Sequence, residues 1–282
     1  MWGDGKKIKV IVMKKNNKMS ADDVAKLKAV ALYVLDKCGE TDFIHLFKII
    51  YFAERKIYAK YGQHLVKDTF VAMEHGPVPS NLYDALKLMN GKGNNKSVKS
   101  ISDSLLPAGG ECAWFFVKSS EKPDMDELSK AEVEALDEAI ARYKDVDTKT
   151  LSEMSHDIAW HAAWDKSHNT QMSPLDIAKA GEASDEFLRY LAEQEIINPY
   201  LPACRKVLHY LLKATDYDFL EGEDRFVDCS DFKKISKERF ADLFSAEKQK
   251  GKINQQDVKK IKDLICSYEN VSMKMLRRFG LM

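Results

Sequence analysis

Residues 70–80 read FVAMEHGPVPS, and this stretch decides how the surrounding chain folds. Its first part, taken with the preceding threonine (Thr69–Met73), is rich in β-forming residues and predicts a strand. Its second part, His75–Ser80, holds one glycine and two prolines. The glycine frees the backbone, whereas each proline fixes φ and is excluded from a helix interior. We therefore predict a strand that ends in a rigid turn, followed by a helix that Ser80 caps.

Two helical patterns precede this stretch. Ser20 and Asp23 form a capping-box pattern at the start of the first helix, and Gly39 is its expected stop. Thr41 is the expected cap of the second helix, whose apolar and aromatic residues share one broad face up to Gly62. Because so few residues join the two helices, we expect them to form an antiparallel hairpin.

Further along, the chain is again mostly helical. Glycine, asparagine and serine are frequent between residues 90 and 110, which predicts a long surface loop. The aromatic stretch Glu111–Val117 predicts a second strand, which we expect to pair with Phe70–Met73. Helical patterns follow at Ser129–Tyr143 and Thr150–Ala163. The expected fold class is α+β, mainly α-helical, with a compact helical domain and a small antiparallel β element.

We divide the chain into three parts. Residues 1–19 form a flexible, basic N-terminal tail, residues 20–197 a compact domain, and residues 198–282 a helical C-terminal extension. The extension is expected to contain a helix from Pro202 to Ala214. The stretch that follows, Asp216–Cys229, is acidic and irregular.

Charge is balanced overall but distributed unevenly. The chain has 44 basic and 44 acidic residues, so no global field attracts nucleic acid or an acidic membrane. Residues 1–20 carry six lysines and one aspartate, a net charge of +5, and residues 232–282 carry a net charge of +7. We interpret these basic ends as solvated surfaces. Contact with nucleic acid or an acidic partner is the alternative interpretation.

Two features predict a cytoplasmic protein. Charged residues interrupt every apolar run well before the roughly 18 residues that a membrane-spanning helix needs, so no contact with a membrane is expected. The five cysteines are odd in number, far apart and without C-x-x-C spacing. This pattern favours reduced thiols over a disulfide framework or a zinc site.

The sequence lacks the usual catalytic motifs. It contains no phosphate-binding loop, no nucleophile elbow and no H-E-x-x-H zinc motif. His156 and His161 are five residues apart and fall on different faces of a helix, so they make a poor metal pair. The adjacency of Ser155-His156-Asp157 carries no weight, because catalytic triads are assembled in space. We predict no catalytic residue, no metal and no cofactor, and a protein that is not an enzyme.

Residues 26–87 resemble a known family, the Panacea domain, also called the SocA-like antitoxin family. Residues 46–54 (LFKIIYFAE) match its helical K-L-x-Y-x-A-D/E core, Tyr61-Gly62 matches its helix stop, and residues 70–80 match its strand and G-P-V-P-S segment. Two features depart from the family pattern. Val66-Lys67-Asp68 stands where the family often has a Thr-Gly-Asp-like turn, and the long loop that follows is less standard.

The resemblance implies a compact, mainly helical domain that acts as the antitoxin of a bacterial or prophage toxin–antitoxin system of type II-like organisation. Such a protein neutralises a cognate protein toxin by direct binding. The expected partner-binding residues are Tyr51, Glu54, His75, Gly76, Pro77 and Pro79. Core packing for the tyrosine and turn architecture for the prolines are equally good interpretations. The loop at residues 90–110 and the extension at residues 198–282 are the candidates for selecting the toxin.

Two alternatives to a toxin-binding protein stay open at this point. The stretch Val258–Arg278 carries six basic residues on two helical patterns, so the chain could regulate its own operon by binding DNA. We favour a solvated amphipathic helix pair instead, because lysines commonly cover the outward face of such helices. A phage-associated adaptor that delivers a partner to a protease is the other alternative. A homo-oligomer is compatible with each of these interpretations.

Overall fold

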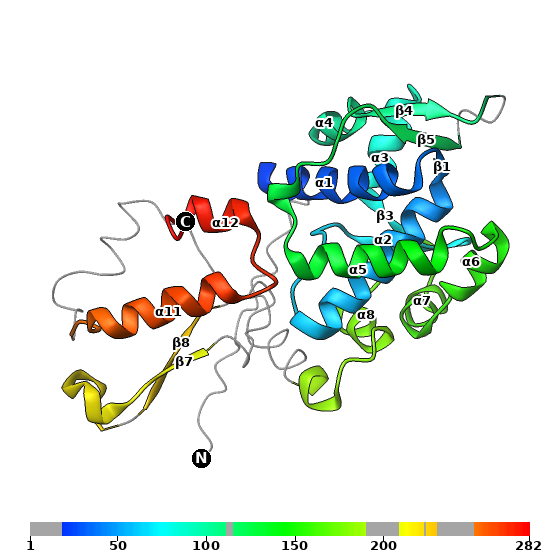
Figure 1. Cartoon of the computed structure of the whole chain (residues 1–282). Helices are drawn as coiled ribbons and strands as arrows, with labels where there is room; N and C mark the ends of the chain where they lie inside the picture. The colour runs from blue at the N-terminus through cyan, green and yellow to red at the C-terminus, as the bar shows by residue number, and fades with distance from the viewer. Residues whose placement is uncertain (1–18, 111–114, 190–208, 223, 230–250) are drawn as a thin grey trace, which may run out of the picture.

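The computed structural model describes residues 19–110, 115–189, 209–222, 224–229 and 251–282. Figure 1 shows a helical body with small sheets at its periphery, and the C-terminal elements beside it. The predicted α+β class, with a helical majority and small antiparallel sheets, is confirmed. Most of the predicted N-terminal tail and the predicted boundary near residue 198 lie outside the described residues.

Helix α2 (Phe43–Tyr61) is the central element of the body, and most of its residues are buried. It begins after Asp42, whose carboxylate accepts a hydrogen bond from the backbone N–H of His45 at 2.9 Å. The predicted cap, Thr41, is therefore wrong by one residue: both Thr41 and Asp42 pair with a neighbouring strand, and only the Asp42 carboxylate accepts the N–H of the first turn. The helix ends at Gly62 in the left-handed conformation, as predicted.

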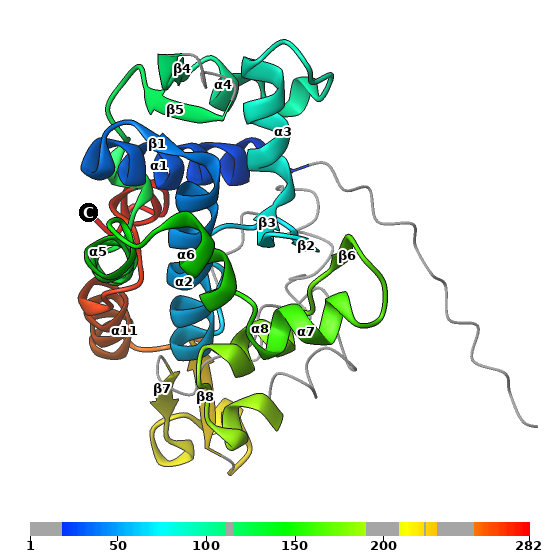
Figure 2. The ribbon, with the colours of Figure 1, turned by 90° about the vertical axis from the view of Figure 1, so that its right-hand side faces the viewer.

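Helix α1 (Ala21–Cys38) begins at the predicted capping box. The Ser20 hydroxyl accepts a hydrogen bond from the Asp23 N–H at 3.1 Å, and the Asp23 carboxylate accepts the Ser20 N–H in return. Gly39 ends the helix, as expected. Figure 2 shows α2 crossing α1 steeply, so the predicted antiparallel hairpin is wrong. A short strand between the two helices redirects the chain.

A three-stranded antiparallel sheet in the order β3-β2-β6 lies beside α2. Its strands are β2 (Phe70–Met73), β3 (Gly76–Pro79) and β6 (Thr170–Gln171). The predicted strand β2 is confirmed, but the predicted rigid turn is mostly strand β3. Met73 and Gly76 face each other in the register, so the chain reverses its direction only at the residues between them.

Two prolines fit into β3 because it is an edge strand. Pro77 and Pro79 lie opposite Ala72 and Phe70, whereas the Ser80 N–H donates to the Thr69 carbonyl at 2.9 Å. Hydrogen-bonded pairs alternate with non-hydrogen-bonded pairs in an antiparallel ladder. Both prolines therefore stand where an N–H would point away from β2, and nothing is lost by its absence.

A second antiparallel sheet has the order β1-β5-β4. Its strands are β1 (Thr41–Asp42), β4 (Leu105–Ala108) and β5 (Phe116–Ser119). The second predicted strand, Glu111–Val117, thus begins five residues late and ends two residues late, and the first residues of the predicted range lie outside the described part of the chain. Its predicted pairing with β2 is wrong, because β5 pairs with β4, the strand just before it in sequence.

The predicted surface loop at residues 90–110 is also wrong. It contains the 3-10 turn η1 (Lys96–Val98), helix α4 (Lys99–Ser102) and strand β4. The side chains of Val98 and Ile101 are buried in the main core. These two apolar residues anchor the polar segment to the body. For this reason the composition of the segment, which predicted a surface loop, gave the wrong structure.

Several of the remaining helices of the body pack against α2. Helix α5 begins at the capping box of Ser129 and Glu132, as predicted, and the ring of its last residue, Tyr143, stacks on Phe52 at 4.1 Å. The predicted helix at 150–163 is two helices, because the Asp157 carboxylate starts a new helix by accepting N–H groups. The bounds are α3 (Ser80–Met89), η3 (Met125–Glu127), α5 (Lys130–Tyr143), α6 (Thr148–Met154), α7 (Ile158–Trp164) and α8 (Pro174–Ala180).

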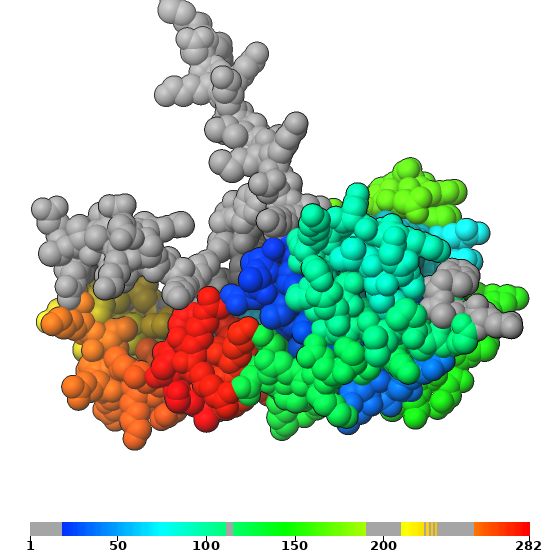
Figure 3. All heavy atoms as spheres, turned by 90° about the horizontal axis from the view of Figure 1, so that it is seen from above, coloured from blue at the N-terminus to red at the C-terminus, as the bar shows by residue number. Residues whose placement is uncertain are grey.

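The C-terminal elements mix strands with helices. The predicted helix ending at Ala214 is wrong over residues 209–212, which form a strand; its first residues lie outside the described ranges. In Figure 3 the surface of α12, drawn in red, lies against that of α1, drawn in blue. The elements are β7 (His209–Leu212), η5 (Ala214–Asp216), η6 (Asp218–Leu220), β8 (Arg225–Asp228), α11 (Gln255–Ser267) and α12 (Met273–Arg278).

Candidate functional site

Three polar side chains of helix α2 are at most 1% exposed, and they tie other segments to the helix. Tyr51 is fully buried, and its hydroxyl donates to both carboxylate oxygens of Asp157 at 3.0 and 2.8 Å. Glu54 is also fully buried; it bonds His64 Nδ1 at 2.5 Å and accepts the N–H of Val66 at 3.0 Å. Burial and the neighbouring Asp157 raise the pKa of Tyr51 well above its usual value, so the phenol stays a donor.

Lys48 is the third of these side chains, and it binds the β2–β3 hairpin to α2. It is 1% exposed, and its ammonium donates to the Pro77 carbonyl at 2.9 Å. That carbonyl belongs to the outer edge of β3, which has no further strand beyond it. The lysine therefore satisfies an edge acceptor that the ladder leaves open.

Gly76 makes room for this arrangement. Its φ is +94°, and a Cβ added there would lie 2.2 Å from Ser155 Oγ and 2.8 Å from Lys48 Nζ. No residue with a side chain fits without moving both groups. The glycine of the G-P-V-P segment is thus required by the two buried polar groups behind it, in addition to its backbone conformation.

Asp68 caps helix α3 from outside the helix. Its carboxylate accepts hydrogen bonds from the backbone N–H groups of Thr69, Asn81 and Leu82 at 2.7, 3.0 and 3.1 Å. The predicted cap, Ser80, is wrong: it is the first residue of the helix, and its hydroxyl donates to Asp68 at 3.2 Å. The hairpin brings the chain back beside residue 68, and this return creates the cap.

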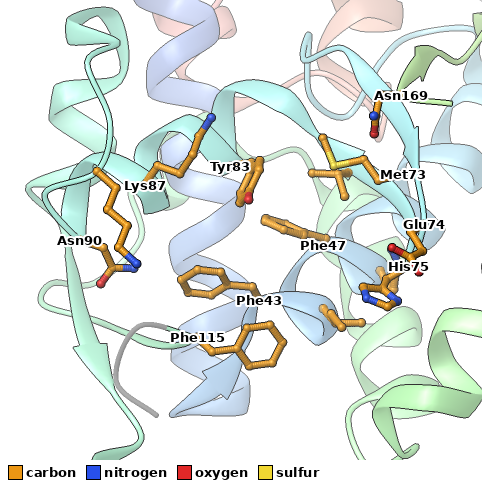
Figure 4. A pocket seen from close by; sticks show the side chains of 14 residues that line it. Phe43, Phe47, Met73, Glu74, His75, Tyr83, Lys87, Asn90, Phe115 and Asn169 are labelled. Atoms are coloured by element: carbon orange, nitrogen blue, oxygen red, sulfur yellow. The ribbon is translucent and has the colours of Figure 1, made fainter. Parts of the chain in front are cut away.

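A cavity of about 430 Å³ opens beside the hairpin. Figure 4 shows aromatic rings of α2, α3 and the chain before β5 on one side of it, and the tip of the β2–β3 hairpin on the other. The ring centroids of Phe43 and Phe47 lie 6.2 Å apart, and those of Phe47 and Tyr83 lie 5.9 Å apart. The remaining lining residues are Ile44, Lys48, Met73, Glu74, His75, Val78, Lys87, Asn90, Lys92, Phe115 and Asn169.

The six residues predicted to bind a partner occupy different positions relative to this cavity. His75 is exposed at the tip of the hairpin and lines the cavity. Gly76, Pro77 and Pro79 are buried in β3 and hold the hairpin in place. Tyr51 and Glu54 are inaccessible from outside, with internal partners for their polar atoms. Contact between any of the six and a partner stays a prediction.

Sequence reasoning missed Lys48 and the aromatic residues of the cavity. In residues 46–50, LFKII, the lysine is flanked by large apolar side chains that are all buried. A lysine inside such a run either reaches solvent at the margin of the helix or is buried with an internal hydrogen-bond partner. The apolar run around Lys48 could therefore have predicted its burial. The aromatic lining could not be found, because α2, α3 and Phe115 meet only in the folded chain.

The residues Ser155, His156 and Asp157 are not arranged for catalysis. The Ser155 hydroxyl is fully buried and donates to the Ser152 carbonyl at 2.7 Å. The His156 ring stacks on Trp160 at 3.8 Å, whereas Asp157 bonds Tyr51. The three side chains thus serve three different neighbours. Across the described ranges, no group of three or more metal-binding side chains converges on one point.

The basic residues of α12 face acidic partners on the body. Arg278 pairs with Asp22 at 2.6 Å, and Arg277 pairs with Asp126. Lys274 pairs with Glu127 and lies 3.8 Å from Asp22. Cations held in ion pairs with the same chain are less free to bind phosphates.

Comparison with known proteins locates the site within a recognised domain. Residues 46–161 match the family model described as antitoxin SocA-like, Panacea domain. The match begins within α2 and ends within α7, and it includes the hairpin and most of the cavity wall, but not Phe43, Ile44 or Asn169. Neither the curated proteins nor the solved structures gave a match. No helix in the described part of the chain is long and apolar enough to cross a bilayer.

Proposed function

We propose, from the match of residues 46–161 to the SocA-like antitoxin Panacea domain, that the chain neutralises a cognate protein toxin by direct contact in the cytoplasm. The domain match indicates an antitoxin role and a toxin as partner. Direct binding, without a chemical step, is our proposal for how the role is carried out.

The cavity beside the β2–β3 hairpin is the observation that supports this proposal most. A concave, largely aromatic surface on a rigid scaffold is suited to anchoring a side chain of a partner. The scaffold is rigid here because Lys48, Tyr51 and Glu54 fix three segments to α2 through buried hydrogen bonds. Ser155 and His156, which are adjacent in sequence and resemble part of a catalytic triad, have other partners in the fold: the serine hydroxyl bonds a backbone carbonyl and the histidine ring stacks on a tryptophan.

Co-expression with the product of the adjacent reading frame tests the proposal. We expect that product to stop growth when expressed alone, and the wild-type chain to restore growth and to co-purify with it. His75→Ala should weaken the complex about tenfold, the cost of one moderate interface contact. His161→Ala is the matched control, because His161 is an exposed histidine outside the cavity.

Regulation by DNA binding is less well supported. The three cations of α12 that such a function would use are paired with Asp22, Asp126 and Glu127. A gel shift on the upstream region that depends strongly on salt would favour DNA binding, and failure of growth rescue would count against toxin neutralisation.

A further inference from the structure

Lys48 is a buried cation without a counter-charge in the described part of the chain. Its side chain is 1% exposed, and its hydrogen-bond partner is the neutral Pro77 carbonyl at 2.9 Å. An ammonium has three donors, so this bond leaves room for further acceptors. Burial without a carboxylate is costly for a charged group, and it lowers the pKa of Lys48 to about 7.

The same lysine lines the aromatic cavity, and the other charges there do not neutralise it. Lys87 at the rim pairs with Asp84 at 2.6 Å and lies over the Tyr83 ring at 4.7 Å. Glu74 is exposed at the tip of the hairpin, and burial alone, with no contribution from a neighbouring charge, accounts for the lowered pKa of Lys48. The cavity therefore combines an uncompensated cation with apolar walls, and a ligand that complements both would carry a carboxylate next to an apolar group.

We propose that the cavity binds the C-terminal residue of the partner polypeptide, with its carboxylate directed at Lys48 and an aromatic or aliphatic side chain against Phe43, Phe47 and Tyr83. This inference rests on the proposed function for the identity of the partner. The volume of about 430 Å³ is close to the lower end of the range for small-ligand sites and suits about one or two residues. A chain end enters such a cavity with one residue, whereas an internal segment must both enter and leave.

The carboxylate of the ligand supplies the counter-charge that Lys48 lacks in the described part of the chain. An ion pair formed in an apolar, partly enclosed site is stronger than one formed in water, because the surroundings screen it less. The approach of the carboxylate also provides an acceptor for the donors of Lys48 that the Pro77 carbonyl does not use. A C-terminal amide of the same size offers the apolar contact but no charge.

Three short peptides test the proposal on the purified full-length chain. They are acetyl-glycyl-phenylalanine as the free acid, the same peptide as its amide, and acetyl-aspartyl-phenylalanine amide, which carries its carboxylate on a side chain. Affinities are measured by titration, with chemical shifts of Tyr83 and His75 reporting the place of binding. We expect the free acid to bind at least tenfold more tightly than either amide.

Two variants identify the role of the lysine. Lys48→Met keeps the length and packing of the side chain, and it should remove the preference for the acid over the amide. Lys87→Met at the rim is the matched control and should change the acid affinity less than threefold. Thermal melting confirms that each variant is folded, and the comparison of acid with amide on the wild-type chain decides the question even without them.

Equal binding of acid and amide, binding of neither, or an unchanged preference in Lys48→Met would overturn the inference. Binding of the aspartyl amide as tight as that of the acid would overturn the assignment to a chain end. These assays use no toxin, so a negative result here is separate from a failure of growth rescue in co-expression.

Discussion

The helical body and the C-terminal elements are stabilised in different ways. The body has one continuous core, which extends from Val24 on α1 to Ile177 on α8. The C-terminal elements have two small clusters, one around Ile265 and Leu276 and one around Leu212 and Leu220. Stability grows with the apolar surface that a unit buries. The body is thus built to hold the cavity rigidly, and the C-terminal elements depend on the body for support.

Several of the contacts between the two regions are polar. Exposed ion pairs join α12 to the body, among them Arg278–Asp22 at 2.6 Å. A buried bond between Ser129 and Asn270 at 3.1 Å adds to them. Surface ion pairs contribute about 0–1 kcal/mol each. We therefore expect the C-terminal elements to open more readily than the body.

Alanine substitution of one glycine in each region should give the largest contrast. In the body, Gly76→Ala places a Cβ at 2.2 Å from Ser155 Oγ, at a φ of +94°. We expect a loss of about 3–5 kcal/mol in the free energy of unfolding. In the C-terminal elements Gly280, at a φ of +64°, has no atom within 4 Å of an added Cβ. Its substitution by alanine should cost about 1 kcal/mol. Urea unfolding followed by circular dichroism measures both, and equal losses would contradict the contrast.

Lys48→Met should have the next largest effect, and it should stabilise the body. The pKa of this lysine is about 7 in the folded chain and 10.5 when the side chain is in water. This shift corresponds to about 5 kcal/mol by which burial disfavours the charged form relative to the neutral form. The cost of burying the charge is complete below pH 7 and disappears as the pH rises toward 10.5. Loss of the bond to Pro77 offsets about 1–2 kcal/mol.

We therefore expect the free energy of unfolding of the variant to exceed that of the wild type by about 2–4 kcal/mol at pH 6. At pH 9 this difference should be smaller. Urea midpoints of both proteins at the two pH values measure this difference. Lys130→Met, at an exposed lysine of α5, should change stability little at either pH. An advantage that grew with pH would show that Lys48 is not a destabilising buried cation.

Charge reversal at Asp22 should have the smallest effect, and it should be confined to the C-terminal elements. Asp22 accepts a hydrogen bond from Arg278, and this contact holds the pKa of its carboxyl below the usual value. Asp22→Lys should raise the amide hydrogen exchange of α12 about three- to fivefold, since about 1 kcal/mol is at stake. The amides of α2 should not respond.

Asp36→Lys is the control for this reversal, because Asp36 pairs with Lys122 within the body. It should leave the exchange of α12 unchanged. Raising the salt concentration should reproduce the effect of Asp22→Lys in the wild-type chain, because salt screens exposed pairs. If α2 and α12 responded together, the two regions would form one cooperative unit.

Local signals in the sequence predicted local structure well. The capping boxes at Ser20 and Ser129, the stop at Gly62 and the strand at Phe70–Met73 were all found. Each depends on residues within a few positions of one another, so a short stretch of sequence contains the whole cause. The family resemblance was found on the same basis, from residues 46–54 and 70–80, and the domain match confirms it.

Contacts between distant residues were not predictable in this way. The cap of α3 comes from Asp68, which reaches the helix only after the hairpin has folded. The pairing of β5 with β4 depends on a segment whose composition suggested a loop, and two buried apolar residues decide the outcome. The cavity is a stronger case, because its walls come from five separate parts of the chain. Burial of Lys48 follows from the same long-range packing.

Titration of purified toxin with the purified chain tests the central proposal most directly, since a docking protein and an enzyme differ in stoichiometry. With the toxin at fixed concentration, we predict that its activity falls linearly as the chain is added and reaches zero at a fixed molar ratio, independent of incubation time. Inactivation of many toxin molecules by one molecule of the chain, progressing with time, would contradict the proposal.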